Sequence, residues 1–422
     1  MSGLPGSLSI ESIHYTASSV KRCMDIVSPP KYIKNILVTL ESHDFEAYLV
    51  GGCVRDILLG SCPQDWDICT NALPEQIMDI FPETHPTGLK HGTVTVMQGR
   101  HSAEVTTYRT ESAYSDHRRP DTVQFVTDLT ADLARRDFTM NAIAASARGL
   151  VVDPFGGIED IGSKIIRCVG EPEKRFQEDA LRMFRAYRFS ARLGFSIEAE
   201  TNKAIAACSS LASALAPERV QDELQKILRT DRTRVIGHMI RLGLLNDYLD
   251  GDPDNCPDLR ILSTVPRKAS IRWPVFALVL RQCGLIRNVS VFLTCLRLDR
   301  VTVRTASAAD EICTRGLPDQ RTELMQIMSI YGVDAVKCAY YAYDALYGTR
   351  REKEVVAVLK SGACFSLDKL AISGGDLLAL GYKGPELGRM LQFLLDYVIH
   401  YPQNNTREIL LNIAAKDSEN EY

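Results

Sequence analysis

Two aspartates, Asp65 and Asp67, lie two residues apart in the segment DWDICT. If this segment is a β-strand, both side chains leave the same face, roughly 6–7 Å apart along the strand. Two carboxylates at that spacing can hold two Mg²⁺ ions about 3.5–4 Å apart, the separation used for in-line phosphoryl transfer. We predict that Asp65 and Asp67 are metal ligands and catalytic residues, with Glu104 in AEVTTYR as a third catalytic carboxylate. Ordinary exposed strand residues are the alternative for all three.

A glycine pair precedes these aspartates in the segment YLVGGCVRDILLG. Gly51 and Gly52 allow close backbone approach, the helix that should begin there offers its N-terminus to an anion, and Arg55 lies one turn in. The segment lacks the Lys-Ser/Thr ending of a Walker A loop and the third glycine of a dinucleotide-binding motif. An ordinary glycine turn would look the same. The aspartate pair ten residues after Arg55 favours one site for phosphate and metal.

The elements that must position these residues change in kind along the chain. Between about residues 45 and 168, short strand-like runs alternate with turns and with helical patterns after Gly52, after Pro74 and over residues 132–147. From residue 171 onward the periodicity is almost only helical. We therefore expect an α+β fold, in which a mixed sheet with helices is followed by an all-α region.

Composition limits the class of protein. The 422 residues carry a net charge of −4, with 45% apolar and 24% charged residues, as in soluble globular proteins. No apolar run approaches the roughly 18 residues of a membrane span, and the N-terminus lacks the pattern of a secretion signal. The 12 cysteines have no paired spacing, which favours free thiols in a reducing cytoplasm. We expect a cytoplasmic protein that binds no membrane and contacts nucleic acid only through local patches.

Six further segments follow GGCVRDILLG and DWD in a fixed order: TGLKHGTVTV, RRPDTVQFV, RRDFTMNAIA, DPFGGIEDI, RFQEDALRMFRAYRFSARLGF and PERVQDELQKIL. Together they cover about residues 48–228. The set resembles the polymerase β-like nucleotidyltransferases, in the branch that contains tRNA CCA-adding enzymes and bacterial poly(A) polymerases, of the bacterial and eukaryotic class.

The resemblance implies a polymerase β-like nucleotidyltransferase head followed by a helical neck, body and tail. We place an N-terminal extension of unknown role at residues 1–30, the head at 31–168 and the neck, with nucleotide-base recognition, at 169–230. The tRNA-binding body and tail then occupy residues 231–320 and 321–422.

A base-reading site is implied by the segment EDALR, in which Glu178, Asp179 and Arg182 match the family motif. Cytosine and adenine both present an amino donor beside a ring-nitrogen acceptor, whereas guanine and uracil present the reverse. A carboxylate and a guanidinium three residues apart on one helix face would match the first pattern and leave buried groups unpaired against the second. Nucleotides would then be selected without a nucleic-acid template.

Other nucleotide contacts are implied by the resemblance. Arg185 and Arg188 continue the same row toward the triphosphate, with salt bridging on the helix surface as the alternative. Arg136 is implied to contact phosphate, and Asp137 is implied to serve the ribose with Asn141. For Asp137, a carboxylate favoured at a helix start by the helix dipole is a second interpretation that is compatible with the first. Met183, Phe184 and Phe189 are expected to be core residues.

The segment at residues 107–123 resembles the family's flexible loop, with a solvated loop as the alternative. Nine basic residues between 257 and 304 are candidates to contact a tRNA phosphate backbone, although charged stretches are usually only solvated faces.

The function predicted from all of this is the addition of C, C and A to tRNA from CTP and ATP, with Mg²⁺, on the acceptor and T stem. The alternatives are a poly(A) polymerase, an enzyme that adds only the terminal A, and a non-catalytic RNA-binding protein. The sequence leaves the oligomeric state open.

Overall fold

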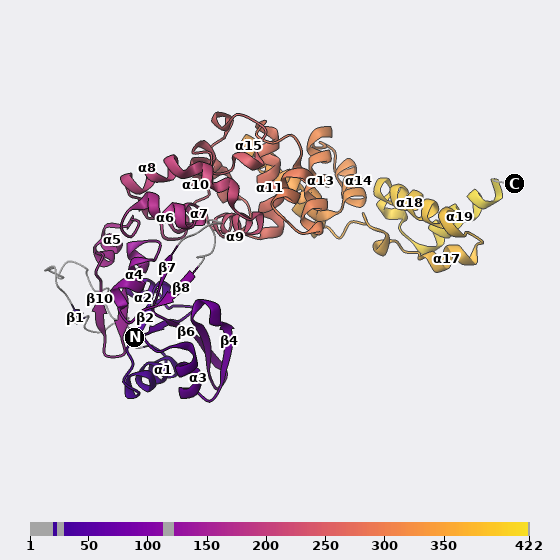
Figure 1. The fold of residues 1–422 in the computed structure, drawn as a ribbon. Helices are drawn as coiled ribbons and strands as arrows, with labels where there is room; N and C mark the ends of the chain where they lie inside the picture. Colours follow the sequence, from indigo (N-terminus) through magenta and orange to yellow (C-terminus); the bar gives the residue numbers. More distant parts are fainter. Residues whose placement is uncertain (1–19, 23–28, 113–121, 421–422) are drawn as a thin grey trace, which may run out of the picture. The chain divides into compact units, whose positions relative to one another are not determined.

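A computed structural model describes residues 20–22, 29–112 and 122–420 of the chain. It divides into two compact units, Met1–Glu223 with His238–Leu245, and Leu224–Gly237 with Asn246–Tyr422. The first contains the sheet and the second is helical, so the α+β fold class is confirmed (Figure 1). The boundaries of head, neck, body and tail stay a prediction.

An eight-stranded mixed sheet forms the centre of the first unit, in the order β1-β10-β9-β2-β3-β6-β5-β4. Only the β3–β6 pair in it is parallel; the other neighbours are antiparallel. Its strands are β1 (Val20–Arg22), β2 (Ala47–Val50), β3 (Asp67–Thr70), β4 (Thr84–Gly88), β5 (Thr93–Gln98), β6 (His101–Thr107), β9 (Ala144–Ser146) and β10 (Leu150–Val152). A separate antiparallel hairpin joins β7 (Arg109–Ser112) to β8 (Thr122–Phe125), and β11 (Ile165–Ile166) pairs with β12 (Ser196–Ile197).

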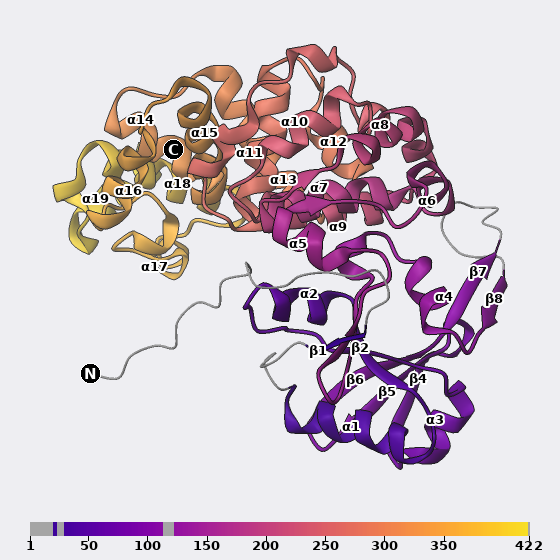
Figure 2. The same cartoon turned by 90° about the vertical axis from the view of Figure 1, so that its left-hand side faces the viewer.

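Helices cover both faces of the sheet. Figures 1 and 2 show α1 and α3 on one side and α2 and α4 on the other. The helices of this unit are α1 (Lys31–Ser42), α2 (Gly52–Leu58), α3 (Pro74–Ile80), α4 (Leu129–Ala134), α5 (Gly157–Ser163), α6 (Pro172–Glu178), α7 (Leu181–Leu193) and α8 (Ala199–Cys208). The helices predicted after Gly52 and after Pro74 are therefore confirmed as α2 and α3.

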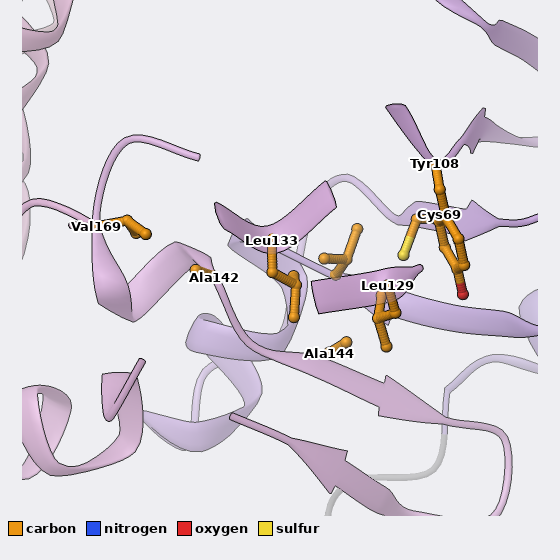
Figure 3. Close-up of a cluster of buried hydrophobic side chains, with 8 residues drawn as sticks. Cys69, Tyr108, Leu129, Leu133, Ala142, Ala144 and Val169 are labelled. Carbon is orange, nitrogen blue, oxygen red and sulfur yellow. The ribbon is translucent and has the colours of Figure 1, made fainter. Parts of the chain in front are cut away.

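A buried apolar cluster ties α4 to the sheet (Figure 3). Asp128 caps α4 by accepting a hydrogen bond from the Thr130 amide at 2.9 Å, and Leu129 and Leu133, one turn apart, share its buried face. They pack with residues from the strands and the following loop, namely Val50, Cys69, Tyr108, Ala142, Ala144 and Val169. Burying each leucine contributes about 1.5–3 kcal/mol, which fixes the helix that leads into Arg135 and Arg136.

The helix predicted over residues 132–147 is wrong beyond Ala134. Phe138 is extended and forms an isolated bridge with Cys168, while the Thr139 amide donates to the Arg167 carbonyl at 2.9 Å. A short 3-10 helix, η3 (Thr139–Asn141), follows, and β9 then joins β2 in the sheet. These long-range backbone bonds outweigh the local helical pattern.

The second unit is built from helices. Within it, α11, α13 and α15 pack against one another, and α14 packs against α18. Two helices, α9 (Pro217–Leu228) and α10 (Arg234–Arg241), contain residues of both units. The others are α11 (Ala269–Gln282), α12 (Val289–Cys295), α13 (Arg300–Arg315), α14 (Arg321–Tyr331), α15 (Val333–Tyr347), α16 (Glu352–Lys360), α17 (Gly374–Ala379), α18 (Gly384–His400) and α19 (Arg407–Asn420). None of the helices in the described residues is long and apolar enough to cross a membrane.

Arg272, one of the nine basic residues proposed to contact tRNA phosphate, is only 1% exposed. Its guanidinium donates to the carbonyls of Leu228 and Val265, both at 2.7 Å, inside the second unit. The prediction is therefore wrong for Arg272, which serves packing. Of the loop predicted at residues 107–123, positions 113–121 lie outside the described residues, as does most of the extension at residues 1–30.

Candidate active site

A cavity of about 690 Å³ in the first unit gathers the residues singled out from the sequence. All the predicted site residues except Glu104 line it. They are Gly51, Gly52, Arg55, Asp65, Asp67, Arg136, Asp137, Asn141, Asp179, Arg182, Arg185 and Arg188. Segments more than a hundred residues apart in the chain thus form one site.

The carboxylate side of the cavity lies at the start of β3. Asp67 is the first residue of the strand and half-buried, whereas Asp65 is exposed in a bend before the strand, which corrects the prediction of both on one strand. Glu104 on β6 is the direct lateral neighbour of Asp67 in the parallel pair, but it does not line the cavity. Burial raises the pKa of Asp67, the Arg136 guanidinium opposes this, and the negative charges of Glu104 and Asp65 raise it further.

These oxygens suit a hard divalent cation. A cation at Asp65 and Asp67 would offset both the burial of the Asp67 carboxylate, which is the main cause of its raised pKa, and its repulsion by Glu104 and Asp65. Among the described residues, no group of three or more His, Cys, Asp or Glu side chains is arranged to hold a metal ion alone. Two carboxylates are enough for a divalent cation that completes its coordination with water and substrate phosphates.

The glycine turn brings the backbone against a guanidinium. Gly51 has a φ of +78°, in the left-handed region that favours glycine, and a Cβ there would lie 3.1 Å from Arg136 Nη1. From α2, buried Arg55 donates to Asn141 Oδ1 at 2.6 Å and to Asp56 Oδ1 at 2.9 Å. The turn therefore lies against Arg136 and is followed by the helix that carries Arg55, and both arginines line the cavity.

Asp132 holds Arg136 and its neighbour Arg135. This fully buried carboxylate on α4 accepts from Arg135 Nη2 at 2.8 Å and from Arg136 Nη2 at 3.1 Å. Burial alone would raise the pKa of Asp132, but the charges of Arg136 and Arg135 lower it overall. Arg136 Nε is buried without a hydrogen-bond partner in the described part of the chain.

Asp137 is fixed by three donors. Its Oδ1 accepts from the Phe138 amide at 2.8 Å and from Asn141 Nδ2 at 3.0 Å, and its Oδ2 accepts from Arg185 Nε at 2.8 Å. Burial alone would raise the pKa of Asp137, but the Arg185 charge and the bonds from Asn141 and Arg185 lower it to about 2. Asp137, Asn141 and Arg185 thus form one connected group.

The lowered pKa of Asp137 predicts a pH dependence of stability. Its contribution is fully present above the unfolded-state value of about 3.9 and is lost as the pH falls through about 2. Between pH 7 and pH 3 we expect the wild-type free energy of unfolding to fall by about 1 kcal/mol more than that of Asp137→Asn. Urea unfolding of both proteins at the two pH values measures the difference. Equal losses in the two would contradict a lowered pKa at Asp137.

The two residues predicted to read the base are arranged differently from the prediction. Asp179 is not on a helix with Arg182: it is extended, with φ −143° and ψ 102°, between α6 and α7. Its Oδ1 accepts from the Leu181 amide at 3.0 Å and its Oδ2 from Arg219 Nη2 at 2.9 Å. The carboxylate thus accepts from the first backbone amide of α7, which has no partner inside the helix. The helix is interrupted at Asp179 even though the sequence pattern is helical on both sides.

Arg182 is oriented by other partners. Its Nη1 donates to Glu178 Oε2 at 2.6 Å, and its Nη2 donates to the Arg135 carbonyl at 2.9 Å. Asp179 and Arg182 still line the same cavity, each held by a residue outside the pair. Arg219 Nη1, like Arg136 Nε, is buried without a partner among the described atoms.

Further along α7, Arg188 forms a buried ion pair with Glu223 of α9, and Arg192 pairs with Asp56 at 3.1 Å. Met183, Phe184 and Phe189 are buried, as predicted.

Seven lining residues were not predicted: His91, Arg109, Arg135, Leu181, Phe189, Arg192 and Arg219. All of them except Arg109 lie inside the sequence segments on which the resemblance rests, so those segments could have identified them as candidate site residues. Their part in a cavity became visible only when the chain was folded.

Comparisons with known proteins agree with this architecture. Residues 47–167 match the family described as "Poly A polymerase head domain", and residues 194–250 match "Probable RNA and SrmB- binding site of polymerase A". The CCA-adding enzyme of Lactiplantibacillus plantarum is 36% identical over 399 residues, 92% of this chain and 97% of that protein. The CCA-adding enzyme of Geobacillus thermodenitrificans is 47% identical over 242 residues, 57% of this chain and 58% of that protein.

Among solved structures, the Bacillus stearothermophilus CCA-adding enzyme in complex with CTP is similar with a TM-score of 0.76 and 31% identity. The similarity covers 93% of this chain and 99% of that one.

Proposed function

The chain belongs to the family of CCA-adding enzymes, and we propose that it adds C, C and A to the 3′ end of tRNA from CTP and ATP without a nucleic-acid template. One observation carries the proposal: a single cavity is lined by a carboxylate pair, by several arginines, and by Asp179 and Arg182, which we propose to read the base. Such a cavity has the parts needed to bind a nucleoside triphosphate, select its base and transfer its nucleotide.

Base selection rests on Asp179 and Arg182. The carboxylate accepts from the amino group of cytosine or adenine, and the guanidinium donates to the ring nitrogen beside it. Glu178 and Arg219 hold the two side chains from outside, so neither has to be ordered when the nucleotide binds. Guanine and uracil would leave both groups unpaired, which disfavours them.

Phosphate binding rests on four other arginines that line the same cavity. Arg55, Arg136, Arg185 and Arg188 supply positive charge and guanidinium N–H donors for phosphate oxygens. Asp137 and Asn141 serve the ribose. Because the arginines are held by buried carboxylates before any ligand arrives, the site is arranged in advance for developing charge.

In the reaction, the RNA 3′-hydroxyl attacks the α-phosphorus. An O–P bond forms, the bond to the bridging oxygen of pyrophosphate breaks, and the hydroxyl proton is lost. Asp65 and Asp67 would hold the divalent metal on which nucleotidyltransferases of this family depend, and we propose Mg²⁺. When bound, the metal lowers the pKa of the attacking hydroxyl and stabilises the leaving oxygens. The protein's own contribution is positioning and charge.

The helical region is proposed to bind the acceptor and T stem of tRNA, with the head at residues 31–168, the neck at 169–230, the body at 231–320 and the tail at 321–422. A cytoplasmic location is proposed as well. All eleven cysteines in the described residues are free, which suits a reducing compartment.

The proposal is tested with three RNAs: a tRNA ending before CC, one ending after CC, and an unrelated RNA. We expect CTP alone to add two residues to the first, ATP alone to add one residue to the second, and the third to stay unchanged. Addition of A only, to the second tRNA, would indicate the A-adding alternative. Long A tracts on any RNA would indicate a poly(A) polymerase.

A further inference from the structure

The ring of Phe189 lies among three guanidiniums of the cavity wall. The Cζ atoms of Arg188, Arg55 and Arg185 lie over it at 3.9, 5.1 and 5.4 Å from the ring centroid. All three distances are inside the roughly 6 Å at which a cation is attracted to an aromatic face. Phe189 is only 3% exposed, yet it lines the cavity. Its surroundings are therefore not those of an ordinary core phenylalanine.

The helix brings this about. Arg185, Arg188 and Phe189 are at positions i, i+3 and i+4 of α7, so they share one face. Arg55 reaches the same ring from α2. Phe138 packs edge-on against the ring with centroids 5.9 Å apart and an angle of 86°, which fixes its plane.

Three cations held this close repel one another. Each has one carboxylate partner: Asp56 for Arg55, Asp137 for Arg185 and Glu223 for Arg188. Further carboxylates would hold the arginines more firmly, but they would also cancel the positive charge that a phosphate needs. An aromatic face attracts guanidiniums without adding net negative charge.

We infer that Phe189 is a positioning residue for the triphosphate of the incoming nucleotide. Its ring holds the guanidiniums of Arg55, Arg185 and Arg188 close together. Because the ring carries no net charge, their positive charge stays available to the β- and γ-phosphates. The inference rests on the proposed function, because it assumes a nucleoside triphosphate in this cavity. Since the phosphates are common to CTP and ATP, the ring affects both equally and does not select the base.

The test compares variants of the full chain by isothermal titration with CTP, ATP and inorganic tripolyphosphate, in Mg²⁺ and without tRNA. Phe189→Leu removes the ring, and Phe189→Met is a second non-aromatic variant with a more adaptable side chain. Phe184→Leu is the matched control, since Phe184 is a fully buried phenylalanine of the same helix that does not line the cavity.

We expect Phe189→Leu and Phe189→Met to weaken the binding of all three ligands by about tenfold, as loss of several cation–π contacts predicts. Phe184→Leu should lower the Tm but leave the three affinities within about twofold of wild type. In steady-state assays, KM for CTP and ATP should rise together while the preference over GTP and UTP is kept.

Affinities of Phe189→Leu and Phe189→Met within twofold of wild type would overturn the inference and make the ring a packing residue. A loss confined to CTP and ATP, with tripolyphosphate unaffected, would also overturn it by placing the effect at base or ribose. Wild-type protein that binds neither CTP nor ATP would instead overturn the proposed function itself.

Discussion

Replacement of Asp67 by asparagine is expected to remove nucleotide addition while tRNA affinity stays within a few-fold. Asp67 is half-buried at the first position of β3, beside Glu104. Burial, together with the negative charges of Glu104 and Asp65, disfavours its ionised form and raises its pKa. An amide of the same shape cannot hold a divalent cation with the same strength, and the metal acts in the transition state and not on the RNA stem. We expect kcat to fall by at least about a hundredfold.

The measurement is single-turnover addition of one C to a tRNA lacking CCA, together with a binding titration of that tRNA. Asp65→Asn should behave in the same way. Asp79→Asn, an exposed aspartate on α3, is the control and should keep wild-type turnover. Retention of more than about a tenth of wild-type turnover by Asp67→Asn would contradict the role of the carboxylate pair.

Loss of the Arg182 guanidinium should degrade the choice of nucleotide and not only the rate. Arg182→Ala leaves the ring nitrogen of cytosine or adenine without its donor, at a cost of roughly 1–3 kcal/mol, or about 5- to 150-fold in kcat/KM. GTP and UTP never gained from that donor, so their use should fall little. Glu178 keeps its ion pair with Arg175 at 2.6 Å, so the variant does not leave that carboxylate unpaired.

The preference is measured as kcat/KM for each of the four nucleotides on a tRNA without its CCA end. Lys174→Ala, which removes an exposed cation of α6, is the matched control. If Arg182→Ala lowers the use of all four nucleotides by the same factor, the guanidinium does not read the base.

Exchange of the two charges, Asp179→Arg with Arg182→Asp, is not a clean test of base reading. The new arginine would face Arg219, and the new aspartate would face Glu178. Both contacts would turn from attraction to repulsion in a partly buried site. An inverted reader therefore requires changes at Glu178 and Arg219 as well.

Much of the fold could be predicted from the sequence because the local backbone preferences of its residues agree with the tertiary structure. Gly51 and Gly52 end a strand and begin a helix, and Pro74 begins another, as their backbone preferences indicate. The split between a mixed α/β part and a helical part followed from a change of hydrophobic period, and motifs in a fixed order brought distant residues into one hypothesis.

The failures share one cause, which is that distant partners decide the local conformation. The pattern over residues 132–147 is helical, but Phe138 and Thr139 bond to residues near 168 and Ala144 joins the sheet. Asp179 interrupts a helical pattern because its carboxylate accepts from the first amide of α7 and pairs with Arg219. Arg272 is basic but buried under carbonyl groups of its own unit. A single sequence does not contain these partners in any local pattern.

We propose that protein side chains alone dictate the sequence C, C, A. The most direct test gives the purified protein a tRNA ending at the position before CCA, with all four nucleotides at equal concentration, and sequences the products. We expect products that end in CCA and stop there, with G and U essentially absent. Products that contain G or U in proportion to supply, that continue as A tracts, or that never gain C would contradict it.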